Sequence, residues 1–134
     1  MKQFQSIFYL DDDIDDLHFF KDIAESLGHT VSTFVSGHQM LNVLDIQREK
    51  PDVIFLDIHM PILNGQEILN VIKNSENWKD IPVIMVSGAY PKKLVRHFME
   101  VGVNYLVKKT HTQDFKIAIE EALKMDLCNT NAVT

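Results

Sequence analysis

The chain lacks the features that mark secreted, membrane-spanning and nucleic-acid-binding proteins. Its single cysteine, Cys128, cannot close an internal disulfide and is compatible with a reducing compartment. No apolar run reaches the roughly 18 residues of a membrane-spanning helix, and residues 1–6 show no secretory signal. Lys and Arg total 13 against 19 Asp and Glu, so the net charge of −6 disfavours binding to nucleic acid or to an anionic membrane. We therefore expect a cytoplasmic protein with neither kind of partner.

The length and composition are those of one ordinary globular domain. The 134 residues are enough for a single hydrophobic core, and the hydrophobic content of 46% is typical of globular proteins. No internal repeat, low-complexity segment or linker divides the chain. A second domain is therefore not expected.

Short apolar runs alternate with helix patterns five times along the chain. Gly28 and Gly102 mark helix ends, and Ser36 followed by Gln39 is a capping-box signal at a helix start. This alternation predicts right-handed crossovers and a doubly wound, flavodoxin-like α/β fold, in which a five-stranded parallel sheet of order 2-1-3-4-5 has helices on both faces. The expected strands are residues 7–10, 30–35, 53–56, 82–86 and 105–107.

Polar side chains stand at the carboxyl ends of four of the predicted strands. Asp11 and Asp12 follow the first strand and Asp57 follows the third, and these strands are neighbours at the switch point where such folds bind ligands. Three carboxylates at close range repel one another, so we expect a hard divalent cation among them, for which Mg²⁺ fits best. Ser87 and Lys108 add a hydroxyl and an ammonium group at the fourth and fifth strands. Together these groups are what phosphoryl transfer onto an aspartate requires.

The same residues stand in motifs that resemble the receiver domain of two-component response regulators. Each motif alone is weak, but the ordered set at these spacings is specific, and the resemblance covers roughly residues 5–125. It implies a receiver domain over residues 1–125, similar to the single-domain chemotaxis regulators, and a short C-terminal tail over residues 126–134 with no output domain. The motifs are Leu10-Asp11-Asp12, Leu56-Asp57-Ile58-His59-Met60-Pro61, Gly65, Val86-Ser87-Gly88 and Val107-Lys108.

The resemblance implies that Asp57 is the phosphoacceptor of a phosphorelay. The phosphoryl group would come from a sensor histidine kinase or from a histidine phosphotransfer protein. The domain would catalyse only its own phosphorylation and dephosphorylation, so it is not expected to be an enzyme with a separate substrate. The implied Mg²⁺ ligands are the carboxylates of Asp11, Asp12 and Asp57 and the main-chain carbonyl of His59.

The resemblance also assigns contacts and a switch to the later strands. Ser87 and Lys108 would contact the phosphoryl oxygens, and Tyr105 would turn inward as Ser87 moves. Phosphorylation would then change a surface of the fourth helix, fifth strand and fifth helix that binds an unknown downstream protein, and dimerisation is left open. Lys109 departs from the family, which has a proline there, usually after a cis bond, so the resemblance does not imply the shape of this loop.

Other interpretations of the same residues remain open or are disfavoured. Residues 7–13 also resemble the strand and Asp-x-Asp motif of phosphohydrolases of the haloacid dehalogenase type, in which Ser87 and Lys108 could fill further motifs. That family needs another acidic pair downstream, where only acids of a predicted helix remain. A receiver fold used solely as a binding module is also open. Zinc at His59 is disfavoured because no Cys-His pair accompanies it, and an EF-hand because Asp16 stands where its loop needs glycine.

Overall fold

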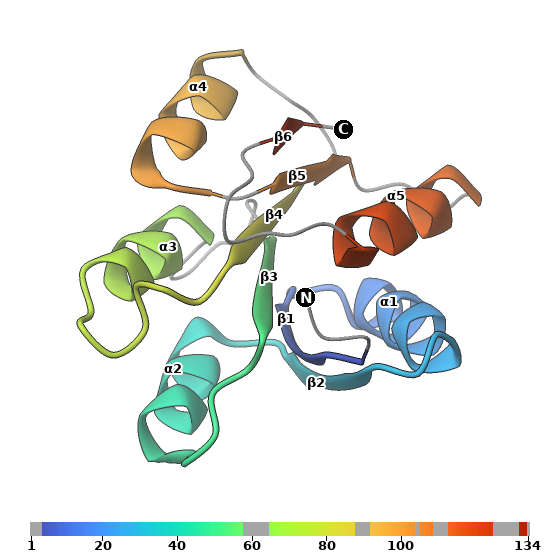
Figure 1. The fold of residues 1–134 in the computed structure, drawn as a ribbon, viewed down its shortest axis with the longest axis horizontal. Coiled ribbons are helices and arrows are strands. Elements are labelled where there is room, and N and C mark those ends of the chain that lie inside the picture. The colour runs from blue at the N-terminus through green and yellow to red at the C-terminus, as the bar shows by residue number, and fades with distance from the viewer. Residues whose placement is uncertain are drawn as a thin grey trace.

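The structure is a computed structural model in which strands and helices alternate along the chain (Figure 1). The description covers residues 4–57, 65–87, 92–103, 105–108, 113–124 and 132–133. Among these residues, every helix is too short or too polar to cross a lipid bilayer. The strands are β1 (Ser6–Leu10), β2 (Thr30–Phe34), β3 (Val53–Asp57), β4 (Val83–Ser87), β5 (Tyr105–Lys108) and β6 (Ala132–Val133). The helices are α1 (Ile14–Ser26), α2 (Gly37–Ile46), α3 (Gly65–Lys73), α4 (Lys92–Val101) and α5 (Gln113–Lys124).

Within the described residues the strands form one parallel sheet of order β2-β1-β3-β4-β5-β6. The first five positions confirm the predicted order 2-1-3-4-5. A sixth strand that was not predicted, β6, adds a parallel partner along β5, with Ala132 opposite Tyr105 and Val133 opposite Leu106. A strand of two residues has no alternation that a sequence pattern can reveal, and it pairs main-chain groups that the edge strand β5 would otherwise expose.

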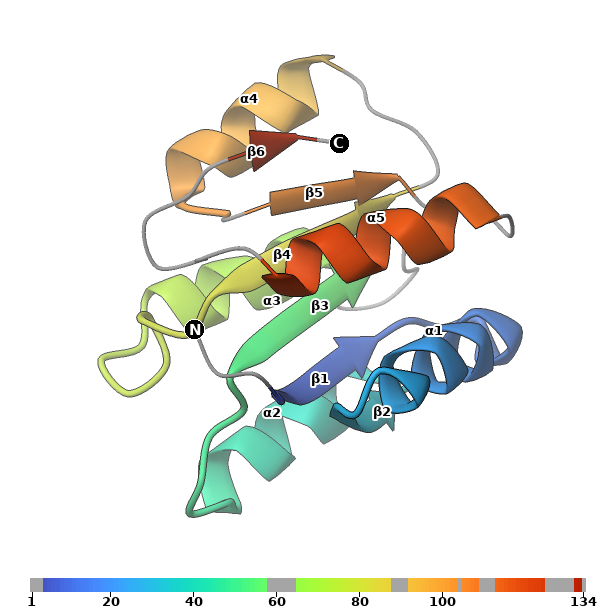
Figure 2. The same cartoon turned by 45° about the vertical axis from the view of Figure 1, so that its right-hand side comes forward.

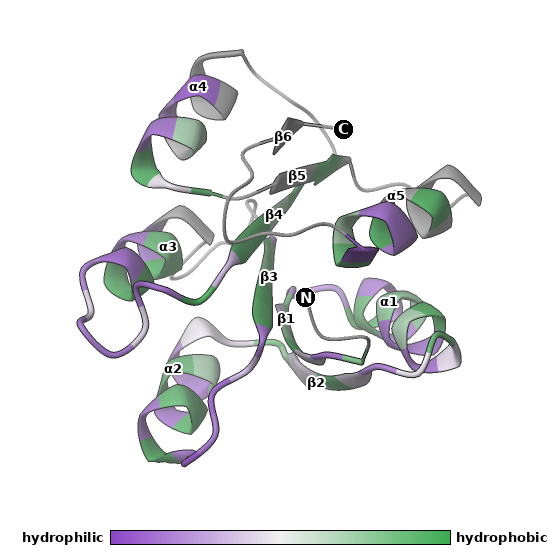
Figure 3. Cartoon of the chain, in the orientation of Figure 1, coloured by the Kyte–Doolittle hydropathy of each residue, from purple (hydrophilic) through white to green (hydrophobic). Residues whose placement is uncertain are grey.

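Two hydrophobic cores lie on opposite faces of the sheet, because side chains alternate along each strand. Ile7 and Tyr9 of β1 pack with residues of α1 and α5, whereas Phe8 and Leu10 pack with residues of α2 and α3. Figures 1 and 2 show these helix pairs on the two sides of the sheet. Every residue of β3 is buried, and the hydropathy colouring shows β3 and β4 as mostly hydrophobic (Figure 3). Continuous burial is what a central strand of a parallel sheet requires.

The ends of the described helices confirm the capping signals in the sequence. Ser36 is the N-cap of α2, and its side chain accepts the main-chain N–H of Gln39 at 3.4 Å. At α1 the N-cap is Asp13, whose carboxylate accepts two main-chain N–H groups of the first turn. Gly28 and Gly102 follow α1 and α4 with φ angles of 97° and 112°. Glycine reaches this left-handed conformation at no steric cost, which explains why both helices end there.

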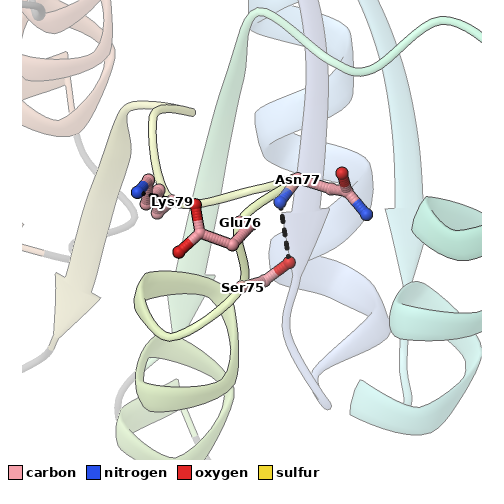
Figure 4. Close-up of polar contacts among 4 residues, drawn as sticks. All are labelled: Ser75, Glu76, Asn77 and Lys79. Carbon is pink, nitrogen blue, oxygen red and sulfur yellow. Dashed lines mark hydrogen bonds and ion pairs between the residues drawn. The ribbon is translucent and has the colours of Figure 1, made fainter.

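Local polar contacts close the connection between α3 and β4 (Figure 4). The main-chain N–H of Asn77 donates to the Ser75 hydroxyl at 3.2 Å, and Lys79 pairs with Glu76 at 2.9 Å. The ion pair is exposed, so it contributes less than about 1 kcal/mol. Trp78 packs, partly buried, against the core on the α2 and α3 side of the sheet, so this side chain anchors the connection.

His29 ties the start of β1 to the turn that follows α1. Its Nδ1 accepts the main-chain N–H of Gln5 at 3.0 Å, and the Gln5 side chain donates to the carbonyl of Leu123 in α5 at 2.8 Å. Burial lowers the pKa of His29, because a charged imidazole is disfavoured where water is excluded. Protonation of Nδ1 would also remove its capacity to accept the hydrogen bond. The folded protein therefore favours neutral His29.

The stability is expected to decrease as the pH falls below about 6.5, the ordinary pKa of histidine. The unfolded chain binds a proton on His29 at a higher pH than the folded protein does, so acid shifts the equilibrium toward unfolding. His29→Asn keeps an acceptor near the Nδ1 position and removes the titration. It should reduce the difference between the urea-unfolding free energies at about pH 7.5 and about pH 5.5.

A matched substitution at an exposed histidine separates this effect from a general one. His38 lies on the exposed surface of α2, so His38→Asn makes the same chemical change away from the corner formed by Gln5 and His29. If His29→Asn and His38→Asn have the same pH dependence, His29 is not the group responsible.

Candidate functional site

The carboxyl ends of β1 and β3 bring three acidic side chains together. Leu10 lies opposite Leu56 in the parallel pair, Asp11 follows β1 directly, and Asp57 is the last residue of β3. The carboxylates of Asp11, Asp12 and Asp57 each offer an oxygen, and these oxygens all lie within 4.8 Å of one another. The structure thus confirms the grouping that was predicted from the strand order.

Burial increases the repulsion among these three carboxylates. Asp11 is fully buried and Asp57 is 2% exposed, whereas Asp12 is exposed to solvent. Negative charges at such distances repel more strongly where water is excluded than at the surface. A set of carboxylate oxygens around one point is the donor set of a hard divalent cation, and Mg²⁺ and Ca²⁺ both favour oxygen ligands. The residues present therefore fit a divalent cation.

Two donors among the described residues contact the carboxylate of Asp11. The hydroxyl of Tyr9 donates to Oδ2 at 2.6 Å, and the main-chain N–H of Asp13 donates to Oδ1 at 2.9 Å. The main-chain N–H of Asp11 itself donates to the carbonyl of Phe34 in β2 at 3.0 Å. Asp11 is therefore fixed through both its side chain and its backbone.

Tyr9 is the member of this site that the sequence analysis missed. It stands in the apolar run predicted as the first strand, and its hydroxyl donates to Asp11, the acid that follows this strand two positions later. Burial raises the pKa of Tyr9 well above its ordinary value, and the neighbouring charges of Asp11, Asp57 and Asp16 raise it further. A buried tyrosine two residues before an acid at a strand end is the signal that could have identified it, because side chains two apart share a face.

The main chain places two further predicted residues at the same edge of the sheet. Ser87 ends β4 and lies opposite Lys108, the last residue of β5, while Asp57 lies opposite Val86. The three strands that carry these residues therefore end side by side. The expected contacts of the Ser87, Lys108 and Tyr105 side chains lie outside the described part of the structure, as do His59 and Lys109, and these assignments stay predictions.

Comparison with known proteins agrees with this arrangement. The family model of the response regulator receiver domain matches residues 7–120 of the chain. The chain belongs to this family. The receiver is a phosphoacceptor signalling module rather than an enzyme with a separate substrate, as the sequence resemblance implied. The alternative of a phosphohydrolase of the haloacid dehalogenase type is therefore wrong.

Several receivers and regulators are similar to this chain. The sensory transduction protein LytT of Oceanobacillus iheyensis is 40% identical over 89 residues, which cover 66% of this chain and 35% of LytT. The polar-differentiation response regulator DivK of Brucella ovis is 33% identical over 85 residues, which cover 63% of this chain and 67% of DivK. The crystal structure of the phosphorylated cyanobacterial phytochrome response regulator RcpA aligns with this chain with a TM-score of 0.78 and 27% sequence identity. The alignment covers 87% of this chain and 91% of RcpA.

The matched region spans only part of many of these proteins. It covers between 16% and 35% of the first four curated relatives. Their similarity to this chain therefore concerns the receiver domain. A functional proposal for this chain rests on the acidic site of Asp11, Asp12 and Asp57.

Proposed function

We propose that this receiver accepts a phosphoryl group on Asp57 in a Mg²⁺-dependent reaction and thereby switches a protein-interaction surface. The observation that carries the proposal is the position of Asp57, a buried carboxylate at the end of the central strand with Asp11 and Asp12 within 4.8 Å. The carboxyl end of a central strand is the edge of the sheet where ligands bind in folds of this type.

Each site residue is proposed to have a different role in phosphoryl transfer. An oxygen of Asp57 attacks the phosphorus, so that an O–P bond forms while the P–N bond to the donor histidine breaks. Bound Mg²⁺ would supply positive charge that offsets the charge on the phosphoryl oxygens. Ser87 and Lys108 would contact these oxygens through a hydroxyl and an ammonium group. The residues proposed to hold the cation are the three carboxylates and one main-chain carbonyl, namely those of Asp11, Asp12, Asp57 and His59.

The phosphorylated site would act on the surface of α4, β5 and α5. Ser87 and Tyr105 are proposed to change position together, which would shift this surface between two states. The phosphoryl donor would be a sensor histidine kinase or a histidine phosphotransfer protein, and the output would be contact with a downstream protein in the cytoplasm.

We also propose that residues 1–125 form the receiver domain, followed by residues 126–134. The extent of the similarity to RcpA, which covers 91% of that chain, supports a domain of this size.

A small phosphodonor tests the assignment of Asp57. With acetyl phosphate and Mg²⁺, intact mass spectrometry is expected to show about 80 Da of added mass on the wild-type protein and none on Asp57→Ala. Asp45→Ala is the matched control, because it removes an exposed acid near the C-terminal end of α2 that is not one of the proposed site residues, and it should retain the added mass. Added mass that persists in Asp57→Ala would refute the assignment, and its absence from the wild type would refute phosphorylation itself.

A further inference from the structure

We propose that Tyr9 is a positioning residue whose hydroxyl fixes the Asp11 carboxylate for divalent-cation binding. The inference rests on the proposed cation-dependent phosphorylation and adds a residue that does not itself touch the cation. Tyr9 lies on β1 and would act only through Asp11, to which it donates a hydrogen bond of 2.6 Å.

The carboxylate of Asp11 has a hydrogen-bond donor on each of its oxygens. The Tyr9 hydroxyl donates to Oδ2, and the main-chain N–H of Asp13 donates to Oδ1 at 2.9 Å. A donor on each oxygen fixes the rotation of the carboxylate, and an ionised acceptor makes these hydrogen bonds stronger than neutral ones. A carboxylate has about four lone-pair sites and can therefore accept hydrogen bonds and bind a cation at the same time. One oxygen of Asp11 lies within 4.8 Å of oxygens of Asp12 and Asp57, where a shared cation would bind.

Aromatic packing holds Tyr9 itself in place. Its ring is fully buried, with its centroid 4.4 Å from that of Phe20 and 6.3 Å from that of Phe55. Phe20 and Phe55 also contact each other, with centroids 4.7 Å apart. A buried tyrosine hydroxyl needs a hydrogen-bond partner, and Asp11 provides it. The aromatic packing therefore sets where the hydroxyl lies.

The coordination geometry of Mg²⁺ makes its binding sensitive to how its ligands are oriented. Mg²⁺ requires nearly ideal octahedral geometry, so an oxygen ligand that can rotate binds it less well. Groups that orient metal ligands through hydrogen bonds typically change metal affinity by about 10–100-fold when they are removed. Tyr9→Phe deletes only the hydroxyl and leaves the ring in place. It is expected to weaken Mg²⁺ binding about tenfold, at the low end of that range because Asp13 still holds the other oxygen of Asp11.

Isothermal titration with MgCl₂ measures this affinity directly, and phosphorylation by acetyl phosphate gives a second measurement. In Tyr9→Phe the initial rate of phosphorylation at limiting Mg²⁺ should decrease by the same factor as the affinity. At saturating Mg²⁺ the rate should return to that of the wild type, because Tyr9 acts only on cation binding. A purely structural role for Tyr9 would not produce this dependence on Mg²⁺ concentration.

Ile7→Val is the matched control. Ile7 lies on the same strand and the same face as Tyr9 and is also fully buried, but it contributes no polar group. This substitution should lower the midpoint of thermal unfolding by a few degrees and leave Mg²⁺ affinity unchanged.

Three outcomes would overturn the inference, and they can be told apart. Equal Mg²⁺ affinity in Tyr9→Phe and the wild type would show that the hydroxyl does not position Asp11. An equal loss of affinity in Ile7→Val and Tyr9→Phe would show that packing alone is responsible. A wild-type protein that binds no Mg²⁺ and gains no phosphoryl group would refute the proposed function, and this failure is visible without any Tyr9 variant.

Discussion

Phe55→Ala is expected to lower the free energy of unfolding by about 3–5 kcal/mol, the range found when a buried phenylalanine is truncated. Phe55 is fully buried in the central strand β3, and its ring packs against those of Phe20 and Tyr9. Removal of the ring leaves a cavity between α1 and the sheet that cannot close unless β1 or α1 moves. A single domain is stable by only about 5–15 kcal/mol, so the variant would retain a small margin.

Urea unfolding monitored by circular dichroism measures this change in the free energy of unfolding. Two further variants provide values for comparison. Phe4→Ala removes the same atoms from a side chain that is 56% exposed, and it should lose less than about 1.5 kcal/mol. Phe55→Leu keeps most of the volume and should lose about 1–1.5 kcal/mol. A loss in Phe55→Ala no larger than that in Phe4→Ala would mean that this aromatic group does not hold α1 to the sheet.

The fold was predictable because its signals are local. A helix start such as Ser36, or a helix stop such as Gly28, depends on residues within a few positions of one another, and the structure confirms Ser36 as an N-cap and Gly28 as the positive-φ residue at the end of α1. The grouping of Asp11 with Asp57 needed one further step, the strand order, because adjacent parallel strands end at the same edge of a sheet. The local signals use spacing and residue type alone, whereas the strand order comes from the fold class that these signals indicate.

The remaining features depend on contacts between side chains distant in the chain or on segments too short to show a pattern. The hydrogen bond from Tyr9 to Asp11 depends on aromatic packing that involves α1 and β3 as well as β1. The hydrogen bond between Gln5 and His29 joins residues 24 positions apart. The pairing of Ala132 and Val133 along β5 involves a two-residue strand. None of these follows from hydrophobic periodicity, which reports the face of a residue and not its partner.

Asp57→Asn is expected to raise the stability of the protein in the absence of divalent cations, by about 1–3 kcal/mol. The Asp57 carboxylate is buried, and oxygens of Asp11 and Asp12 lie within 4.8 Å of it. Asparagine has nearly the same shape and no charge, so it removes the repulsion from both neighbours and the penalty of burying an anion. The gain should be largest in a chelator, at low salt, where the charges are least screened.

Mg²⁺ is expected to reverse this order of stability. A cation that binds only the folded state, at a concentration 100 times its dissociation constant, stabilises the wild type by about 2.7 kcal/mol. Asp57→Asn lacks one anionic ligand and should gain far less. Urea titrations in EDTA and in excess MgCl₂ would measure both effects, and Asp45→Asn, at an exposed position of α2, is the matched control for the loss of one negative charge. If Mg²⁺ stabilises Asp57→Asn as much as it stabilises the wild type, Asp57 is not a ligand, and the three carboxylates do not act as one site.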